Sequence, residues 1–490
     1  MHLILLETSD IQSYLFATNR LRENVGASRL TYRACTQFVL EAVKHLGGPN
    51  LWSNDREKLR ENLATKQPSP NIPIEIIIAT AGKALLLVKD KKVAQTIVSE
   101  VTERALREAP GLDICGVISE PFDWDTDKIH LQVKKLHDSF QEIRSSRPYP
   151  SARFPSLPIA TLCANSGLPA QGVDKDGTEI SAISHFKQIA TSDYHAQQFS
   201  NLSWIAIVHA KVNGIDQIFL EFDKHIGAGY NRNYLNKLRL FSLTLEKAIE
   251  KALIEAINRL SKPIIPLILG NTELCLICDG QIALELTYLF LKAFETSYEG
   301  IPLSACAGVA IAQPHFPLIN TYTLAEELTE KTQILNKRII GQSCSAMDFH
   351  IISNTSFTEI SEIRQQLTIH QNTRLTAKPY IVTADNKHRW AKQHHIDGLL
   401  SRIRAILKRD DYGRHLLPSS QLHQLREGLL MGRDEADGRL KLILTTNPGF
   451  RTLLEQPSKS IFRLAEDGNW ETRFLDALEA APFWKNHENA

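Results

Sequence analysis

The residues best suited to chemistry in this chain lie at the tip of a predicted hairpin. The apolar runs Pro263–Leu269 and Leu274–Cys278 flank the tetrapeptide Gly270–Glu273 (Gly-Asn-Thr-Glu), and two apolar runs around a Gly-Asn turn predict a β-hairpin. Carboxylates at such a tip project from rigid strands into an open cleft, and glycine lets the backbone approach a triphosphate. The position suits magnesium-dependent phosphoryl chemistry, although a motif this short is more often an ordinary turn.

The segments around this hairpin follow a regular order. Upstream lie a strand at Trp204–Ala210 and a helical stretch from about Leu235 to Leu260, and downstream lie a helix-like segment from Gln281 to Glu299 and a strand at Leu303–Ile311. The order β-α-β-β-α-β predicts a split βαβ, or ferredoxin-like, unit.

These motifs resemble the second palm domain of the large polymerase-like subunit of type III CRISPR effector complexes, which is related to GGDEF cyclases. In that family the hairpin reads close to P-L-I-L-G-G-D-D and the returning strand ends in C-D-G, and this chain matches at Pro266–Gly270 and Cys278–Gly280. The resemblance continues through Ala307–Ile311, Pro314–Pro317 and Ala325–Leu328. It implies a palm fold and partners among the other subunits of a defence complex.

The departures from the family pattern fall on its metal-binding acids. Asn271 stands for the second glycine, Thr272 for the first aspartate and Glu273 for the second, while Lys211–Gly214 replaces an acid-bearing strand end and turn. An ammonium group can only donate hydrogen bonds, whereas two-metal phosphoryl transfer needs several carboxylates. We therefore expect no cyclase or polymerase activity, no bound metal and no cofactor.

An N-terminal copy of the same unit indicates an internal repeat at the scale of a domain. Met1–Leu6 is an apolar strand, and Asp10–Phe16 followed by Asn19–Ser28 is similar to the segment that opens the first palm of the family. A second candidate hairpin, Ile74–Val88, has its turn at Ala81–Lys83 and carries no acid there.

The predicted fold class is α+β, with two ferredoxin-like palm domains and a C-terminal helical domain. We expect the first palm and a following helix at 1–146, a linker rich in Pro, Ser and Gly at 147–195, the second palm at 196–354 and the helical domain at 355–490. Cys344–Ile352 is expected to add an edge strand, and Leu417–Leu422 to start a helix that has a serine cap and an apolar stripe.

Composition limits the compartment and the partners. The chain has 490 residues, 43% hydrophobic and 23% charged, with a formal net charge of +1, so any nucleic-acid surface must be local. No apolar run is long enough for a membrane span and the N-terminus does not resemble a signal peptide, so we expect a cytoplasmic protein that does not bind membranes. Seven scattered cysteines fit that compartment.

Metal-ligating residues and charged clusters are weak candidates. Cys275 and Cys278 are three apart on a strand and point to opposite faces, and Cys163 has Ser166 where some relatives carry a second zinc ligand. Near the start of the first palm lies a basic cluster of Arg20, Arg22, Arg29 and Arg33. These residues do not all lie on one helical face, so they give only weak support for a surface that binds the phosphates of a nucleic acid. The adjacent His394 and His395 are interpreted as surface residues.

One cleft is predicted to hold any ligand of the second palm. Its expected residues are Lys211, Asn213, Gly214, Gly270, Asn271, Thr272 and Glu273. A lysine and backbone amides could neutralise the phosphates of a nucleotide without metal. The interpretation we favour is that Lys211 pairs with Glu273 and fills the old metal site with an internal ion pair.

Three functions remain open at this point. The first is a non-catalytic palm-pair scaffold or regulatory subunit of a defence complex that also contacts RNA. The second is a synthase of cyclic or oligomeric nucleotides that uses Glu273 with Glu7 or Asp10, and the third is a sensor that binds a nucleotide between the palms. The first palm starts at residue 1, so we expect no histidine-aspartate nuclease domain before it.

Overall fold

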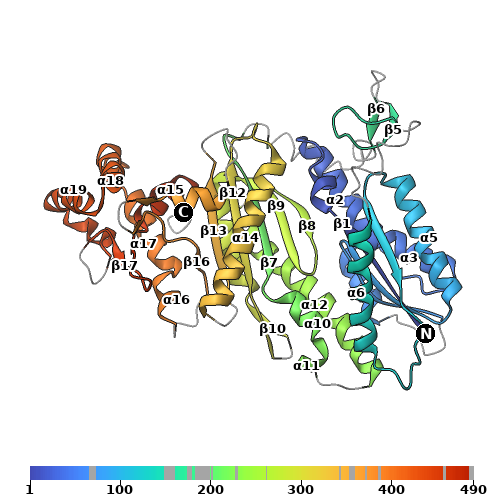
Figure 1. Cartoon of the computed structure of the whole chain (residues 1–490). Helices are drawn as coiled ribbons and strands as arrows, with labels where there is room; N and C mark the ends of the chain where they lie inside the picture. Colours follow the sequence, from blue (N-terminus) through green and yellow to red (C-terminus); the bar gives the residue numbers. More distant parts are fainter. Residues whose placement is uncertain are drawn as a thin grey trace.

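The structure is a computed structural model of the chain. It describes residues 1–65, 73–147, 161–173, 179–181, 199, 202–226, 230–260, 262–298, 300–340, 344–352, 359–369, 372–383, 388–455 and 460–484. Two sheets with their helices and a C-terminal region follow one another along the molecule (Figure 1).

The first palm is a four-stranded antiparallel sheet in the order β2-β3-β1-β4, which is the ferredoxin-like order. Its strands are β1 (His2–Ser9), β2 (Ile74–Thr80), β3 (Lys83–Val88) and β4 (Asp113–Ile118). Its helices are α1 (Ile11–Leu15), α2 (Leu21–Cys35), α3 (Gln37–His45), α4 (Arg56–Thr65), α5 (Lys91–Glu108) and α6 (Ile129–Ser146).

Both faces of this sheet are buried, because successive side chains of a strand point to opposite sides. Ile4 and Leu6 of β1 pack into a core with helices α2, α3 and α5. Leu3 and Leu5 pack into a second core with α6 and with helices of the other palm. The run of apolar residues at the N-terminus is therefore a central strand covered on both sides.

The second palm repeats this order and extends it. The sheet runs β16-β13-β12-β7-β9-β8, with helices on both faces. Its strands are β7 (Ile205–Val212), β8 (Ile264–Leu269), β9 (Glu273–Asp279), β12 (Ala305–Ala312), β13 (Ala346–Ile351) and β16 (Tyr380–Ile381). Its helices are α10 (Ile215–Leu220), α11 (Phe222–Ile226), α12 (Asn231–Asn258), α13 (Gly280–Phe294) and α14 (Leu318–Ile340), and a short hairpin joins β10 (Thr296–Tyr298) to β11 (Ile301–Leu303).

The added strand β13 differs from its expected place. It pairs in parallel with β12 and is covered on its other side by β16, so β13 is not the edge of the sheet. The two-residue strand β16 takes that position, and its sequence is too short to give a strand signal of its own.

The two palms match in register. Glu7 of β1 lies opposite Lys83 and Cys115, and Lys211 of β7 lies opposite Glu273 and Cys306. Both hairpins also carry a register shift in the outgoing strand, in β2 and in β8. The predicted repeat of two ferredoxin-like palms is confirmed.

The palms are joined by helix α12, which packs against β2, α4 and α6. Glu75 of β2 is buried and accepts hydrogen bonds from Arg232 and Arg239 of α12, with 2.6 Å between Arg232 Nη1 and Glu75 Oε2. A buried carboxylate bound by two guanidiniums fixes the orientation of the two sheets.

The C-terminal region is mainly helical, as expected, and also contains a small four-stranded sheet in the order β14-β15-β18-β17. The helices are α15 (Ile360–Gln366), α16 (Arg389–Gln393), α17 (Ile396–Leu407), α18 (Ser419–Met431), α19 (Arg433–Thr446) and α20 (Phe474–Ala480). The strands are β14 (Thr368–Ile369), β15 (Thr373–Arg374), β17 (Arg463–Leu464) and β18 (Trp470–Glu471).

Two expectations for this region are wrong. Ser419 is the first residue of α18 and Pro418 precedes it without a side-chain cap, so serine does not cap this helix. His394 is buried rather than on the surface, because it follows the short helix α16 and stacks on Trp390 with 4.1 Å between ring centroids.

The segment expected as a linker is described only in part. Residues 148–160, 174–178 and 182–195 lie outside the described residues, and the rest includes the hairpin of β5 (Ala170–Val173) and β6 (Glu179–Ser181). The domain limits at 146, 195 and 354 stay predictions. No helix among the described residues is both long enough and apolar enough to cross a membrane.

Candidate functional site

The tips of the two central hairpins meet at a pocket between the palms. Its volume is about 410 Å³, and it lies beside Gly82 and Lys83 of the first hairpin and Asn271–Glu273 of the second. Helices α6 and α10 close its sides through His137 and Asp216. Segments far apart in the sequence thus form one cavity at the ends of the central strands.

Acidic side chains dominate this inter-palm pocket. The carboxylates are Glu7, Asp138, Asp216 and Glu273, and the only ammonium group among the residues that line it is that of Lys83. Burial, with a smaller contribution from the charge of Lys83, lowers the pKa of His137 to about 3, so this imidazole is neutral at pH 7. The lining therefore carries four negative charges against one positive charge.

Lys211 and Glu273 face each other across β7 and β9, but their charged ends have other partners. The ammonium of Lys211 lies 3.6 Å from Asp216 Oδ2, and Glu273 Oε2 lies 3.8 Å from His209 Nε2. The expectation that Lys211 forms an ion pair directly with Glu273 is therefore wrong, because each of the two side chains has a different partner. Lys211 is therefore balanced by Asp216, and Glu273 lies beside the buried imidazole of His209.

His209 favours the ionised form of Glu273. Burial would raise the pKa of Glu273, but its interaction with His209 and the charge of Lys211 outweigh burial and hold this pKa below its usual value. His209 is 2% exposed, and its Nδ1 lies 3.0 Å from Thr329 Oγ1. The Thr329 hydroxyl donates to the Ala325 carbonyl at 2.8 Å, so Nδ1–H of His209 donates to Thr329 and Nε2 faces Glu273.

Sequence reasoning missed His209, although its place could have been found. Residues two apart on a strand share a face of the sheet, so His209 and Lys211 lie on the same face of β7. Glu273 is opposite Lys211 in β9, which brings all three side chains to one end of the sheet.

The seven predicted site residues do not line one cleft. Lys211, Asn213 and Gly214 line a different depression of about 800 Å³ together with Gln333. The buried amide of Asn213 donates to Ser304 Oγ at 2.9 Å and to the Cys344 carbonyl at 3.0 Å. Asn213 therefore ties strand ends together and has no donor left for a ligand.

The other predicted residues lie at the hairpin tip. Asn271 is buried and donates to Ser242 Oγ at 2.9 Å, and the Thr272 carbonyl accepts from the Val212 amide at 2.9 Å. Gly270 and Thr272 line a smaller pocket of about 270 Å³, also bounded by Glu273, on the side of the hairpin that faces α2.

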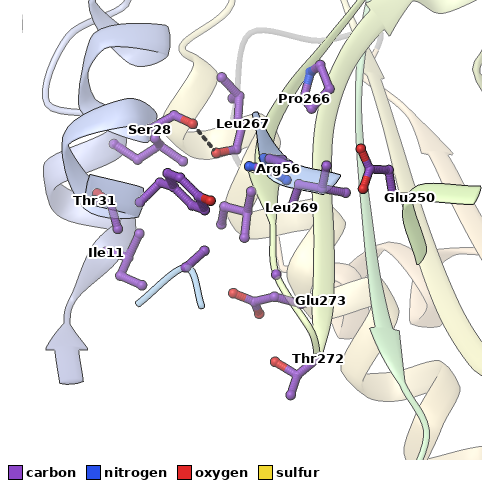
Figure 2. Close-up of a pocket in the computed structure, with 15 residues that line it drawn as sticks. Ile11, Ser28, Thr31, Arg56, Glu250, Pro266, Leu267, Leu269, Thr272 and Glu273 are labelled. Atoms are coloured by element: carbon purple, nitrogen blue, oxygen red, sulfur yellow. Dashed lines mark hydrogen bonds between the residues drawn. The ribbon is translucent and has the colours of Figure 1, made fainter. Parts of the chain in front are cut away.

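Figure 2 shows this smaller pocket between α2 and the second hairpin. Ser28 of α2 donates to the Leu267 carbonyl at 2.5 Å, which ties the first palm to the outgoing strand β8. Arg56 and Glu250 also line this pocket, and Glu273 points into the space below Leu269.

The residues at the strand ends do not fit a pair of divalent metal ions. The two facing positions hold an ammonium group and one carboxylate, and a lysine cannot be a ligand while it is charged. Across the described part of the chain, no three His, Cys, Asp or Glu side chains converge as a metal site would require. The chemistry of the donors thus differs from that of a two-metal centre.

The cysteines at the candidate zinc positions are buried thiols. Cys275 and Cys278 are free and fully buried, and burial raises the pKa of both thiols. Cys163 is also a buried thiol. These thiols act as small apolar side chains of the core.

Comparisons with known proteins identify the fold. No family model matches the sequence, and no curated protein matches it. The solved structure of Csm1 from T. onnurineus matches with a TM-score of 0.54 over 98% of this chain, at 13% identity. The chain has the Csm1 fold.

Two further structures agree with this result. A chain of the Csm1–Csm4 cassette in complex with one ATP matches over 99% of this chain with a TM-score of 0.56 and 13% identity. A chain of the cassette in complex with cA4 matches over 92% with a TM-score of 0.50 and 11% identity. This chain spans 69%, 70% and 63% of the three matched chains, respectively. The expected resemblance is confirmed at the level of the fold.

Proposed function

We propose that this protein is a non-catalytic palm-pair scaffold or regulatory subunit of a type III CRISPR-like antiviral defence complex. The Csm1 fold over nearly the whole chain supports membership of such a complex. The donor chemistry at the strand ends supports the non-catalytic role.

One observation carries the proposal. In each palm, the register position that ends the pairing of the two central strands holds one acid and one lysine, Glu7 with Lys83 and Lys211 with Glu273. Each of these facing positions therefore offers a single carboxylate, whereas two bridging metal ions need several converging on them.

The partners follow from the same comparison. Solved chains with this fold are found in the Csm1–Csm4 cassette, and we propose that this protein likewise binds a Csm4-like subunit and contacts RNA. Affinity purification of the tagged protein from its native host, with mass spectrometry of protein and nucleic acid, tests this. Recovery of the protein alone would contradict it.

The non-catalytic role is tested by incubating the purified protein with ATP or GTP and Mg²⁺ or Mn²⁺ and analysing the products by mass spectrometry. We expect no cyclic or linear oligonucleotide. A product that disappears in the Glu273→Gln or Glu7→Gln variant would show an active synthase with an unusual set of acids, which is the opposite function.

A nucleotide sensor is the second candidate, and the pocket between the palms is the observation that favours it. Its size is sufficient for a ligand, and Lys83 supplies an ammonium group. The excess of carboxylates opposes a triphosphate without metal. Calorimetric titration with ATP in EDTA distinguishes the two, since binding that is lost in Lys83→Ala but kept in Lys211→Ala would favour the sensor.

A further inference from the structure

A second large cleft lies between the second palm and the C-terminal region, and it shares no lining residue with the inter-palm pocket. Its volume is about 720 Å³. On the palm side it is lined by Lys331 and Leu335 of α14, and on the other side by Ser361 and Arg364 of α15 and by Trp390 of α16. Clefts between two packed parts of a chain are common places for small-molecule sites.

The charged side chains that line this cleft are already paired with one another or with neighbours. Arg364 Nη2 donates to Asp348 Oδ1 at 2.5 Å, and Arg374 lies 3.0 Å from Asp467 and 3.1 Å from Glu471. The two lysines of the lining are also paired, Lys331 with Glu327 and Lys378 with Glu479. A phosphate here would meet four carboxylates and no unpaired cation among the described lining residues, so the cleft favours a ligand without net charge.

Asp348 and Arg364 offer such a ligand one acceptor beside several donors. Asp348 is 5% exposed, and its Oδ1 accepts from the Phe349 amide and from Arg364. Within the described part of the chain no group donates to its Oδ2, and this oxygen is not one of the fully buried polar atoms. Arg364 donates to Asp348 and to Thr376 Oγ1, although a guanidinium has five N–H donors. A ligand group with a donor next to an acceptor would satisfy both side chains.

Trp390 adds an aromatic ring on the same side of the sheet. The indole is half-buried, and one of its faces stacks on His394 with 4.1 Å between ring centroids. It packs against an apolar cluster that contains Ala346 of β13. Ala346 and Asp348 are two apart on this strand, so they share a face of the sheet. The ring and the carboxylate therefore border one cleft from the same face.

We infer that this cleft binds a nucleobase, either of a free nucleoside or of single-stranded RNA. A base is a flat ring without net charge that stacks on aromatic side chains, and its Watson–Crick edge carries a donor beside an acceptor. These properties match Trp390 on the one hand and Asp348 with Arg364 on the other. The inference does not rest on the proposed scaffold function, because the cleft uses none of the residues at the strand ends.

Equilibrium dialysis of the full chain with radiolabelled adenosine or uridine tests the site, with Ser361→Trp as the blocking variant. Ser361 is exposed and lines the cleft but takes part in none of its ion pairs, so a bulky side chain there fills the cleft and leaves the buried pairs intact. We expect binding to weaken by about tenfold or more, which is the size of the effect of losing one stacked base. The matched control is Gln366→Trp, at an exposed position of the same helix outside the lining, and it should bind like the wild type.

A labelled oligouridylate, measured by fluorescence anisotropy, separates the two sources of the base. Nucleoside binding that Ser361→Trp removes indicates a free nucleoside, whereas binding of the oligouridylate alone, lost in the same variant, indicates a base of RNA. The inference is overturned if neither probe binds, if Ser361→Trp binds as well as the wild type, or if Gln366→Trp loses as much. Equal competition by an abasic oligomer would also overturn it, because the contacts would then be to phosphates.

Discussion

Glu7 and Lys83 lie opposite each other across β1 and β3, with 3.6 Å between carboxylate oxygen and Nζ, at the position that Lys211 and Glu273 occupy across β7 and β9. The acid of the first palm, Glu7, is on β1, whereas the acid of the second palm, Glu273, is on β9, the returning strand of the hairpin. Each palm thus places one acid opposite one lysine at this position, with the two residue types exchanged between the strands.

A variant that restores carboxylates should gain a metal site. We expect the unfolding temperature of Lys211→Asp/Thr272→Asp to rise with Mn²⁺, since a ligand at one hundred times its dissociation constant stabilises by about 2.7 kcal/mol, while the wild type does not respond. Differential scanning calorimetry with and without Mn²⁺ measures this. Lys135→Asp/Thr96→Asp makes the same charge change at exposed positions and should not respond; an equal response there would refute the prediction.

The buried ion pairs between the palms should be essential for stability. Glu75→Gln leaves Arg239, which is 4% exposed, without its carboxylate, and we expect a loss of about 3 kcal/mol in the free energy of unfolding. Urea denaturation measures it. Glu57→Gln breaks an exposed pair with Lys247 and should cost less than about 1 kcal/mol. Similar losses in both variants would contradict this view of the interface.

Glu471 should make stability depend on acid pH. Burial would raise the pKa of Glu471, but its interaction with His394 and the charges of Arg463 and Arg374 outweigh burial and lower it to about 2. A lowered carboxyl pKa adds stability that is complete above the unfolded value of about 4.3 and disappears as the pH falls toward 2, on the order of 3 kcal/mol in all.

Urea denaturation of Glu471→Gln at several pH values tests this dependence. The variant should be much less stable than the wild type at pH 7, and the difference should shrink as the pH falls below about 4.3. The control Asp434→Asn changes an acid that is 99% exposed and should follow the wild type. A constant difference between Glu471→Gln and the wild type at every pH would show that the carboxylate charge does not matter.

The contact between β12 and α14 should tolerate no side chain at Gly308. A Cβ atom there would lie 2.1 Å from the Ala325 carbonyl oxygen, which is backbone, so we expect Gly308→Ala to cost about 3 kcal/mol or more. Gly438→Ala in α19 meets nothing within 4 Å and should stabilise by about 0.5–1 kcal/mol. Thermal unfolding of the two variants measures the contrast; a stable Gly308→Ala would mean that β12 and α14 can separate easily.

The sequence predicted the two palms well, because the strand and turn signals that define them depend only on neighbouring residues. The apolar runs, the Gly82 turn and the replacement of acids at Lys211 and Thr272 are all visible in the sequence. The partner of Lys211 is not, since its long side chain can reach Glu273 or Asp216 and only the position of α10 decides between them. Similarly, His394 is buried by packing against Trp390, which no periodicity indicates.

The pairing of β16 with β13 has a practical consequence for separating the parts of this molecule. Tyr380 and Ile381 come from the C-terminal region, yet they cover the last strand of the palm sheet. A fragment that ended at residue 354 would leave β13 with free backbone donors and acceptors along one side. Strands exposed in this way associate edge to edge, so the second palm produced alone should aggregate unless residues up to Ile381 are kept.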